Sequence, residues 1–174
     1  MILQEIVVRG EQAQDIAGIR EVNQAAFGQA QEGRIVDVLR NNCRDILSLV
    51  AVLQGRVVGH ILFSPVSLST KERTVTGVGL APMAVLPEFQ RMGVGTTLVR
   101  TGIFSLRARA CPFIIVLGQS RYYSRFGFEK ASAYHIESEW DIPEEAFLIM
   151  ILDSIAMKGM QGTARYRPEF SETV

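Results

Sequence analysis

The sequence predicts a mixed α/β fold of the α+β type, in which a mostly antiparallel sheet of six or seven strands is flanked by about four helices. Apolar residues recur at helical spacing in two N-terminal segments and again after Gly93. Three strand-like segments between residues 46 and 85 follow one another through short turns, which indicates an antiparallel meander. The wholly apolar segment 113–117 stands between two helical segments, which is typical of a central parallel strand.

Residues 1–174 are expected to form a single domain, because this length and a hydrophobic content of 48% suit one globular core. Lys plus Arg and Asp plus Glu both number 18, so no basic excess points to nucleic acid as a partner. No apolar run is long enough to cross a membrane, and residues 1–9 do not resemble a signal peptide. Cys43 and Cys111 form no metal-binding pattern, so we expect reduced thiols in a cytoplasmic protein without a metal.

The N-terminal quarter is expected to form a strand over residues 2–9, a helix over residues 12–27 and a second short helix. Apolar residues mark one face of each helix: Ile16, Ile19, Val22 and Ala26 in the first, and Ile35, Val38 and Leu39 in the second. A polar segment, residues 28–33, connects the two helices.

The meander is expected to comprise strands over residues 46–53, 56–68 and 74–85. Gln54-Gly55 is an acceptable two-residue hairpin turn, and Lys71-Glu72 makes the second turn. Two glycines, Gly77 and Gly79, interrupt the third strand, which indicates either a bulge or a place where a ligand passes close to the backbone.

Pro87 ends this third strand, because proline has no amide hydrogen to offer a neighbouring strand. A helix is expected to begin near Gly93, with Val99, Ile103 and Leu106 on its buried face. The first amide groups of a helix have no partners within it, and the helix dipole adds partial positive charge there. This terminus is therefore a candidate anion site.

The C-terminal half is expected to contain the short strand 113–117, a short helix ending at Gly127, and two last strands near residues 128 and 146–152. The polar tail from residue 157 onward is expected to pack back through Tyr166 and Phe170.

Two sequence blocks resemble one known family. Gln90-x-x-Gly93-x-Gly95 is similar to the pyrophosphate-binding loop of the GNAT superfamily of N-acetyltransferases, and residues 80–89 resemble the strand and Pro-Glu-aromatic entry that precede this loop. The block Tyr-Tyr-Ser-Arg-Phe-Gly-Phe at residues 122–128 resembles the second motif of the family. Its Tyr-Tyr-x-Arg-Phe-Gly-Phe form is most similar to a bacterial subfamily of predicted N-acetyltransferases.

The resemblance implies transfer of an acetyl group from acetyl-CoA to a primary amine of a small molecule or peptide, by direct attack in a ternary complex. It implies a sheet that is split near its middle, beside residues 74–85. The coenzyme A-binding residues that it implies are the strand residues Met83, Ala84 and Val85, which would pair with the pantetheine arm, and the loop residues Gln90, Arg91, Met92, Gly93, Val94, Gly95 and Thr96. Tyr123, four residues before Gly127, matches the tyrosine that serves as general acid.

Some roles stay open at this point. Glu32 and Tyr122 are candidate substrate contacts, although a polar helix entry and a packing residue are equally acceptable interpretations. Residues 74–85 contain no acidic residue, where many relatives place a general base, and His60 is more often structural in such an apolar strand. The alternative function is that of a non-catalytic acyl-CoA-binding sensor or interaction subunit. A third interpretation is an enzyme that uses a longer acyl-CoA as donor. The sequence does not decide between a monomer and a homodimer.

Overall fold

The computed structural model describes residues 5–172, and its contacts divide the chain into two compact units. Unit 1 comprises the described residues up to Phe63, Ala81–Ser105, and the described residues from Glu169 onward. Unit 2 comprises Ser64–Leu80 and Leu106–Pro168. Each unit is thus assembled from separate segments, and two long strands continue from one unit into the other.

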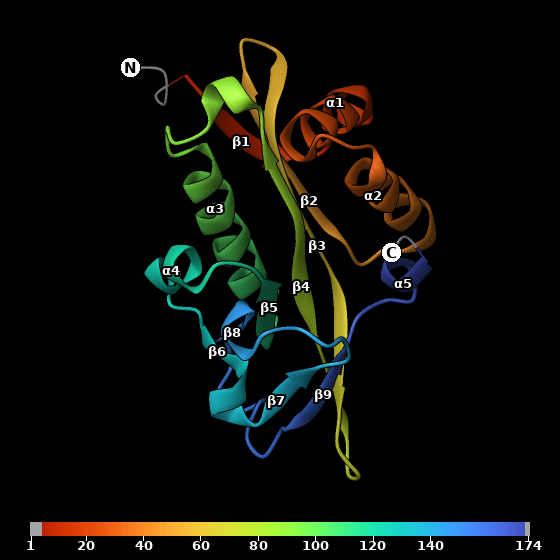
Figure 1. The fold of residues 1–174 in the computed structure, drawn as a ribbon, viewed down its shortest axis with the longest axis vertical. Coiled ribbons are helices and arrows are strands. Elements are labelled where there is room, and N and C mark those ends of the chain that lie inside the picture. The colour runs from red at the N-terminus through yellow and green to blue at the C-terminus, as the bar shows by residue number, and fades with distance from the viewer. Residues whose placement is uncertain (1–4, 173–174) are drawn as a thin grey trace. The chain divides into compact units, whose positions relative to one another are not determined.

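Unit 1 begins with an antiparallel set of strands, β1 (Val7–Gly10), β2 (Leu47–Leu53) and the first part of β3 (Arg56–Ser69) (Figure 1). The turn between β2 and β3 consists of Gln54 and Gly55, with φ of 48° and 81°. Positive φ at both central residues belongs to the hairpin turn whose twist matches that of its strands. This confirms the predicted hairpin. β1 begins within the predicted segment 2–9, of which residues 2–4 lie outside the described residues.

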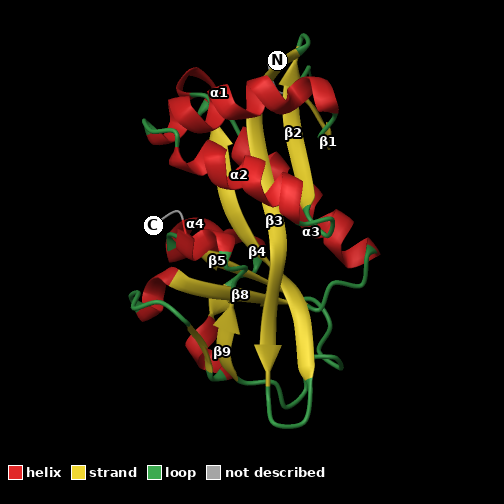
Figure 2. Ribbon diagram, turned by 90° about the vertical axis from the view of Figure 1, so that its right-hand side faces the viewer, coloured by secondary structure: helices red, strands yellow, loops and turns green. Residues whose placement is uncertain are grey.

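Helices cover both faces of these strands. Their bounds are α1 (Ile16–Phe27), preceded by the 3-10 turn η2 (Ala13–Asp15), then α2 (Gln31–Asn42), α3 (Val94–Ala108) and α5 (Glu169–Glu172). Figure 2 shows α1 and α2 side by side across β2 and β3. A Cβ at Gly59 would touch Val94 and Leu98 of α3, whereas the next residue, His60, contacts Asn23 of α1. Alternating residues of β3 therefore face α3 and α1, and α5 contacts α2.

Unit 2 holds a second group of strands. They are the first part of β4 (Thr74–Val85), then β5 (Phe113–Leu117), β6 (Glu129–Lys130), β7 (Ile136–Ser138), β8 (Phe147–Ile151) and β9 (Gly162–Arg165). β5 pairs parallel with β4 and antiparallel with β8, which confirms the predicted central parallel strand. β9 pairs with the end of β3 and with β7. Short helical turns connect these strands: α4 (Ser120–Tyr123), η4 (Ser124–Phe126), η5 (Ala131–Tyr134) and η6 (Glu144–Ala146).

Hydrogen bonds link the strands in the order β1-β2-β3-β4-β5-β8-β6, with β7 and β9 off this path. The predicted class, a mixed α/β fold with a mostly antiparallel sheet, is confirmed. The described residues contain nine strands rather than six or seven, because β7 and β9 are short and polar and carry no hydrophobic alternation. The expected single domain over residues 1–174 stays a prediction.

Gly77 and Gly79 of β4 are surrounded by protein. A Cβ at Gly77 would lie 2.6 Å from the carbonyl oxygen of Phe113, and one at Gly79 would lie 2.6 Å from the ring of Tyr166. The register of β4 with β5 runs without a shift through Val78–Leu80. The two glycines therefore admit neighbouring protein atoms.

Among residues 5–172, no helix is long and apolar enough to span a bilayer.

Candidate functional site

The turn between β4 and α3 carries the first part of the candidate site. After η3 (Pro87–Phe89), the chain turns through Arg91 and Gly93, whose φ values are 62° and 86°. A left-handed conformation at a residue with a Cβ is unfavourable and typically persists at functional sites. Turns of this kind direct backbone N–H groups into a concavity that suits an anion.

α3 begins directly after this turn. The carbonyl oxygen of Gly93 accepts hydrogen bonds from the N–H and the Oγ1 of Thr97, each at 3.0 Å, so Gly93 precedes the first residue of the helix. The predicted helix start near Gly93 is confirmed. The N-terminal amides of α3 and its positive dipole end lie at the same turn as the Arg91 guanidinium, whose side chain is exposed.

β4 supplies the second part of the site within unit 1. The side-chain amide of Gln90 donates a hydrogen bond to the carbonyl oxygen of Val85 at 3.0 Å, which ties the turn to the strand. The N–H of Leu86 donates to the carbonyl oxygen of Val58 on β3. The pairing of β4 with β5 covers Val78–Leu80, and β4 continues beyond it to Val85.

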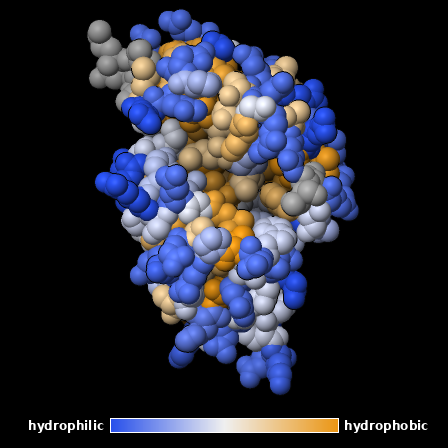
Figure 3. Space-filling view, viewed as in Figure 1, coloured by the Kyte–Doolittle hydropathy of each residue, from blue (hydrophilic) through white to orange (hydrophobic). Residues whose placement is uncertain are grey.

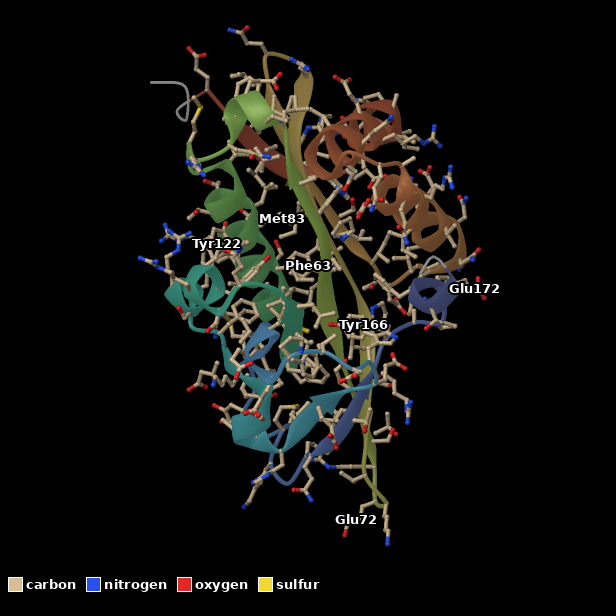
Figure 4. The ribbon with its side chains drawn as sticks, in the orientation of Figure 1. Phe63, Glu72, Met83, Tyr122, Tyr166 and Glu172 are labelled. Carbon is tan, nitrogen blue, oxygen red and sulfur yellow. The ribbon has the colours of Figure 1, made fainter. Side chains whose placement is uncertain are left out.

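Side chains on this part of β4 alternate between two faces. Ala84 is buried, whereas Met83 and Val85 are half-buried. Met83 projects from β4 on the side that faces α3, as Phe63 does from β3 (Figure 4). Apolar surface is visible along β4 in the space-filling view, among the polar side chains that cover most of this face (Figure 3).

Tyr123 closes α4 in unit 2 and is buried, with 8% of its surface exposed. Its ring packs edge-on against Tyr122 and Phe128, with centroids 5.0 and 5.6 Å away. Burial, with a smaller contribution from Tyr122, raises the pKa of Tyr123 to about 12. The phenol therefore stays protonated at neutral pH and can donate its proton.

Tyr122 is half-buried and has a different environment. The guanidinium of Arg125 lies 4.6 Å from the centre of its ring, and the Nε of Arg125 donates to the carbonyl oxygen of Tyr122. Gly127 ends this segment with φ of 103°, which confirms the predicted left-handed cap.

Glu32 lies in the first turn of α2, in unit 1. Its Oε1 accepts a hydrogen bond from the side chain of Gln29 at 3.1 Å. Its Oε2 is buried and has no hydrogen-bond partner among the described residues. The carboxylate therefore retains acceptor capacity for a polar ligand.

His60 is fully buried between α1 and β2. The side-chain amide of Asn23 donates to Nδ1 at 3.2 Å, which places the ring hydrogen on Nε2, 2.9 Å from the Oγ of Ser48. Ser48 in turn donates to Glu11, which pairs with Arg40. Burial, aided by the charge of Arg40, lowers the pKa of His60 to about 3. A neutral ring with both nitrogens engaged acts as a structural group, as its apolar strand indicated.

The structure therefore assembles the candidate residues in separate groups. Met83, Ala84, Val85 and the turn that includes Arg91 and Gly93 form one continuous region of unit 1, while Glu32 lies on α2 of the same unit. Tyr122 and Tyr123 are adjacent in unit 2. Among residues 5–172, no group of three or more His, Cys, Asp or Glu side chains is arranged to hold a metal ion.

Comparisons with known proteins identify the family of the chain. Residues 7–131 match the family described as the acetyltransferase (GNAT) domain. The chain is 39% identical over 156 residues to the uncharacterized N-acetyltransferase YjhQ of Escherichia coli K12, covering 88% of this chain and 86% of that relative.

Two solved structures share the fold. YhbS of Escherichia coli, a GNAT family N-acetyltransferase solved in complex with CoA, is 32% identical with a TM-score of 0.89, and 96% of this chain and 92% of that one are covered. A GNAT family acetyltransferase from Brucella melitensis, solved in complex with acetyl-CoA, is 37% identical with a TM-score of 0.75. The match covers 95% of this chain and 97% of that one. The chain therefore belongs to the GNAT family of N-acetyltransferases.

Proposed function

We propose that this GNAT enzyme transfers the acetyl group of acetyl-CoA to a primary amine of a small molecule or peptide, by direct attack in a ternary complex. The observation that carries the proposal is the left-handed turn at Arg91 and Gly93, which stands at the N-terminus of α3. A backbone concavity joined to a helix N-terminus suits the pyrophosphate of coenzyme A. Two relatives of more than 30% identity were solved with CoA or acetyl-CoA.

The donor site that we propose uses the residues around this turn. The side chains and amides of residues 90–96 (Gln90, Arg91, Met92, Gly93, Val94, Gly95 and Thr96) would hold the pyrophosphate, and the backbone of Met83, Ala84 and Val85 would pair with the pantetheine arm. Because Gln90 holds the carbonyl oxygen of Val85, this hydrogen bond joins the two halves of the donor site.

The transfer step needs a neutral amine and a protonated leaving thiol. The amine nitrogen attacks the thioester carbonyl carbon, the carbon–sulfur bond breaks, the departing sulfur accepts a proton, and the nitrogen releases one proton to solvent water. We assign that proton to the phenol of Tyr123, whose raised pKa of about 12 keeps it protonated. We assign no side chain as general base, because the acceptor can enter as a neutral amine and its nitrogen can release the remaining proton to water. Glu32 and Tyr122 are proposed acceptor contacts.

The Tyr-Tyr-Ser-Arg-Phe-Gly-Phe block at residues 122–128 supports assignment to the bacterial subfamily that shares this block. A sensor that binds acyl-CoA without catalysis is the less favoured alternative, because the curated relatives bear the name N-acetyltransferase. We place the reaction in the cytoplasm, where thiols such as Cys43 and Cys111 stay reduced.

Calorimetry with CoA tests the donor site. Gly95→Val, in the first turn of α3, places a branched side chain where the phosphates must approach, and we expect its Kd for CoA to rise at least about tenfold. Gly93→Val has the same effect and adds strain, because its φ is 86°. Gly159→Val is the matched control, since Gly159 also has a positive φ of 76° and nothing within 4 Å.

Unchanged CoA affinity in Gly95→Val, with an unchanged melting curve, would reject this loop as the phosphate site. The reaction itself is tested by thiol release from acetyl-CoA over a panel of amines, amino acids, polyamines, aminoglycosides and peptides. Tight CoA binding without thiol release across the panel would favour the sensor.

A further inference from the structure

Unit 2 contains a cavity whose lining includes none of the residues proposed for the acetyl-CoA site. It has a volume of about 300 Å³ and lies between β7, the connection that follows it, and the start of β8. Its size is at the lower end of the range for small-molecule pockets, so it suits a ligand of few heavy atoms.

One wall of the cavity is apolar and firmly held. It is formed by Trp140, Ile142 and Phe147. The Trp140 indole packs against the ring of Tyr166, with centroids 4.7 Å apart and planes inclined by 40°, and the backbone N–H of Trp140 donates to the Oγ of Ser138 at 3.0 Å. The half-buried indole lines the cavity and is held by its ring contact with Tyr166, so a ligand that binds there pays little to order it.

The charged part of the lining is acidic. It contains Glu137, Asp141 and Glu144, and the described lining residues include no Lys, Arg or His. Glu144 accepts a hydrogen bond from Ser132 at 2.6 Å. Glu139, by contrast, does not line the cavity and has partners of its own: its Oε1 accepts a hydrogen bond from the backbone N–H of Tyr166 at 2.8 Å, and the guanidinium of Arg165 lies 3.7 Å from its Oε2.

We propose that this cavity binds a small organic ammonium ion. Its carboxylates attract a positive charge and accept its N–H hydrogen bonds, and the indole of Trp140 attracts a cation through its π-face. Ile142 and Phe147 provide the contact for an alkyl chain. A neutral ligand of the same shape gains only the apolar contact. This binding site is additional to the acetyl-CoA site, and its test does not involve acetyl-CoA.

Trp140 makes the cavity directly observable. It is the only tryptophan in the chain, so the intrinsic tryptophan fluorescence reports on this cavity. We expect titration with cadaverine, a five-carbon diamine, to change this fluorescence in a saturable manner. The five-carbon diol with the same chain length is the matched neutral probe and should bind at least about fivefold more weakly. Added salt should weaken the binding of cadaverine and leave that of the diol unchanged, because only a charged ligand is screened.

Variants identify the groups responsible. The double variant Glu137→Gln with Asp141→Asn should raise the Kd for cadaverine about three- to tenfold, as expected for partly solvated charge pairs. Glu145→Gln is the control, because Glu145 is an exposed carboxylate in the same connection that does not line the cavity. Equal affinity for diamine and diol, no fluorescence change, or an equal effect of Glu145→Gln would overturn the proposal.

The ammonium compound that binds in this cavity is either the acceptor of the acetyl group or a ligand that is not acetylated. Mass spectrometry of cadaverine after incubation with enzyme and acetyl-CoA separates them. Acetylated cadaverine, reduced in the double variant, would identify the acceptor, and binding without product would identify a non-reacting ligand. Both results support the ammonium site. A protein that binds cadaverine but transfers no acetyl group would contradict the proposed function and not the ammonium site.

Discussion

The ring of Tyr123 packs directly on the backbone of Gly118, the residue that follows β5. A Cβ atom at Gly118 would lie 2.4 Å from Cε2 of Tyr123 and 3.0 Å from its Cδ2. Tyr122 and Phe128 contact the same ring edge-on. The position of the phenol therefore depends on the absence of a side chain at residue 118.

Gly118→Ala should displace the phenol and lower kcat by up to about 10²-fold, because a catalytic group that is misplaced by about 1 Å loses this much. The affinity for CoA should stay unchanged, since the phosphate loop belongs to the other unit. Steady-state kinetics and calorimetry measure the two effects. Gly10→Ala is the control, because nothing lies within 4 Å of its Cβ position. Equal kcat values in the two variants would show that the ring position does not matter.

Tyr123→Phe should lower kcat by about 10²–10⁴-fold, the usual contribution of a positioned acid. The ring shape is kept and only the proton donor is removed, so CoA affinity should barely change. Tyr122→Phe is the matched control and should have a much smaller effect. A near-normal kcat in Tyr123→Phe, with chemistry rate-limiting, would assign the protonation to water or another group.

The pH dependence of kcat gives an independent test of Tyr123. Its pKa is raised to about 12, so the phenol keeps its proton until the pH approaches that value. We expect kcat to rise with pH as the acceptor amine loses its proton, with no descending limb from Tyr123 below about pH 10. A descending limb between about pH 8 and pH 10 that disappears in Tyr123→Phe would contradict a raised pKa.

His60 should make the stability of the fold depend on pH. Its pKa is about 3 in the folded chain and 6.5 in the reference state, so the unfolded state binds more protons between these values. Its contribution is therefore fully present above about pH 6.5 and is lost as the pH falls toward 3. Between pH 7 and pH 5, the free energy of unfolding should fall by about 2 kcal/mol more in the wild type than in His60→Gln.

Urea unfolding at the two pH values measures this difference. His135→Asn serves as the control, because His135 is exposed and Asn tolerates its φ of 56°. Parallel pH dependence of the wild type and His60→Gln would show that His60 does not titrate on unfolding.

The sequence located helices and strands well where their apolar residues recur at a regular spacing. The bounds of β4 and β5 match the predicted segments 74–85 and 113–117, because a proline or a turn ends each apolar run. β9 was missed, since Gly-Thr-Ala-Arg has no apolar alternation and pairs with strands far away in the chain. Such pairing is a tertiary effect that local propensity does not report.

The candidate site was predictable to a similar degree. The turn before α3 follows from the Gly-x-Gly spacing, but the left-handed Arg91 and the hydrogen bond from Gln90 to Val85 depend on the folded backbone. The cavity beside Trp140 gave no signal, because its walls come from a loop whose side chains converge only through contacts such as that with Tyr166.

The interleaving of the two units has a consequence for synthesis on the ribosome. α5 packs on α2 within unit 1, yet it follows every residue of unit 2 in the chain. Translation of Leu106–Pro168 takes roughly 3–13 s at roughly 5–20 residues per second. During this interval α2 of the nascent chain lacks its contact with α5. Unit 1 is therefore the first unit to emerge from the ribosome and the last to be completed.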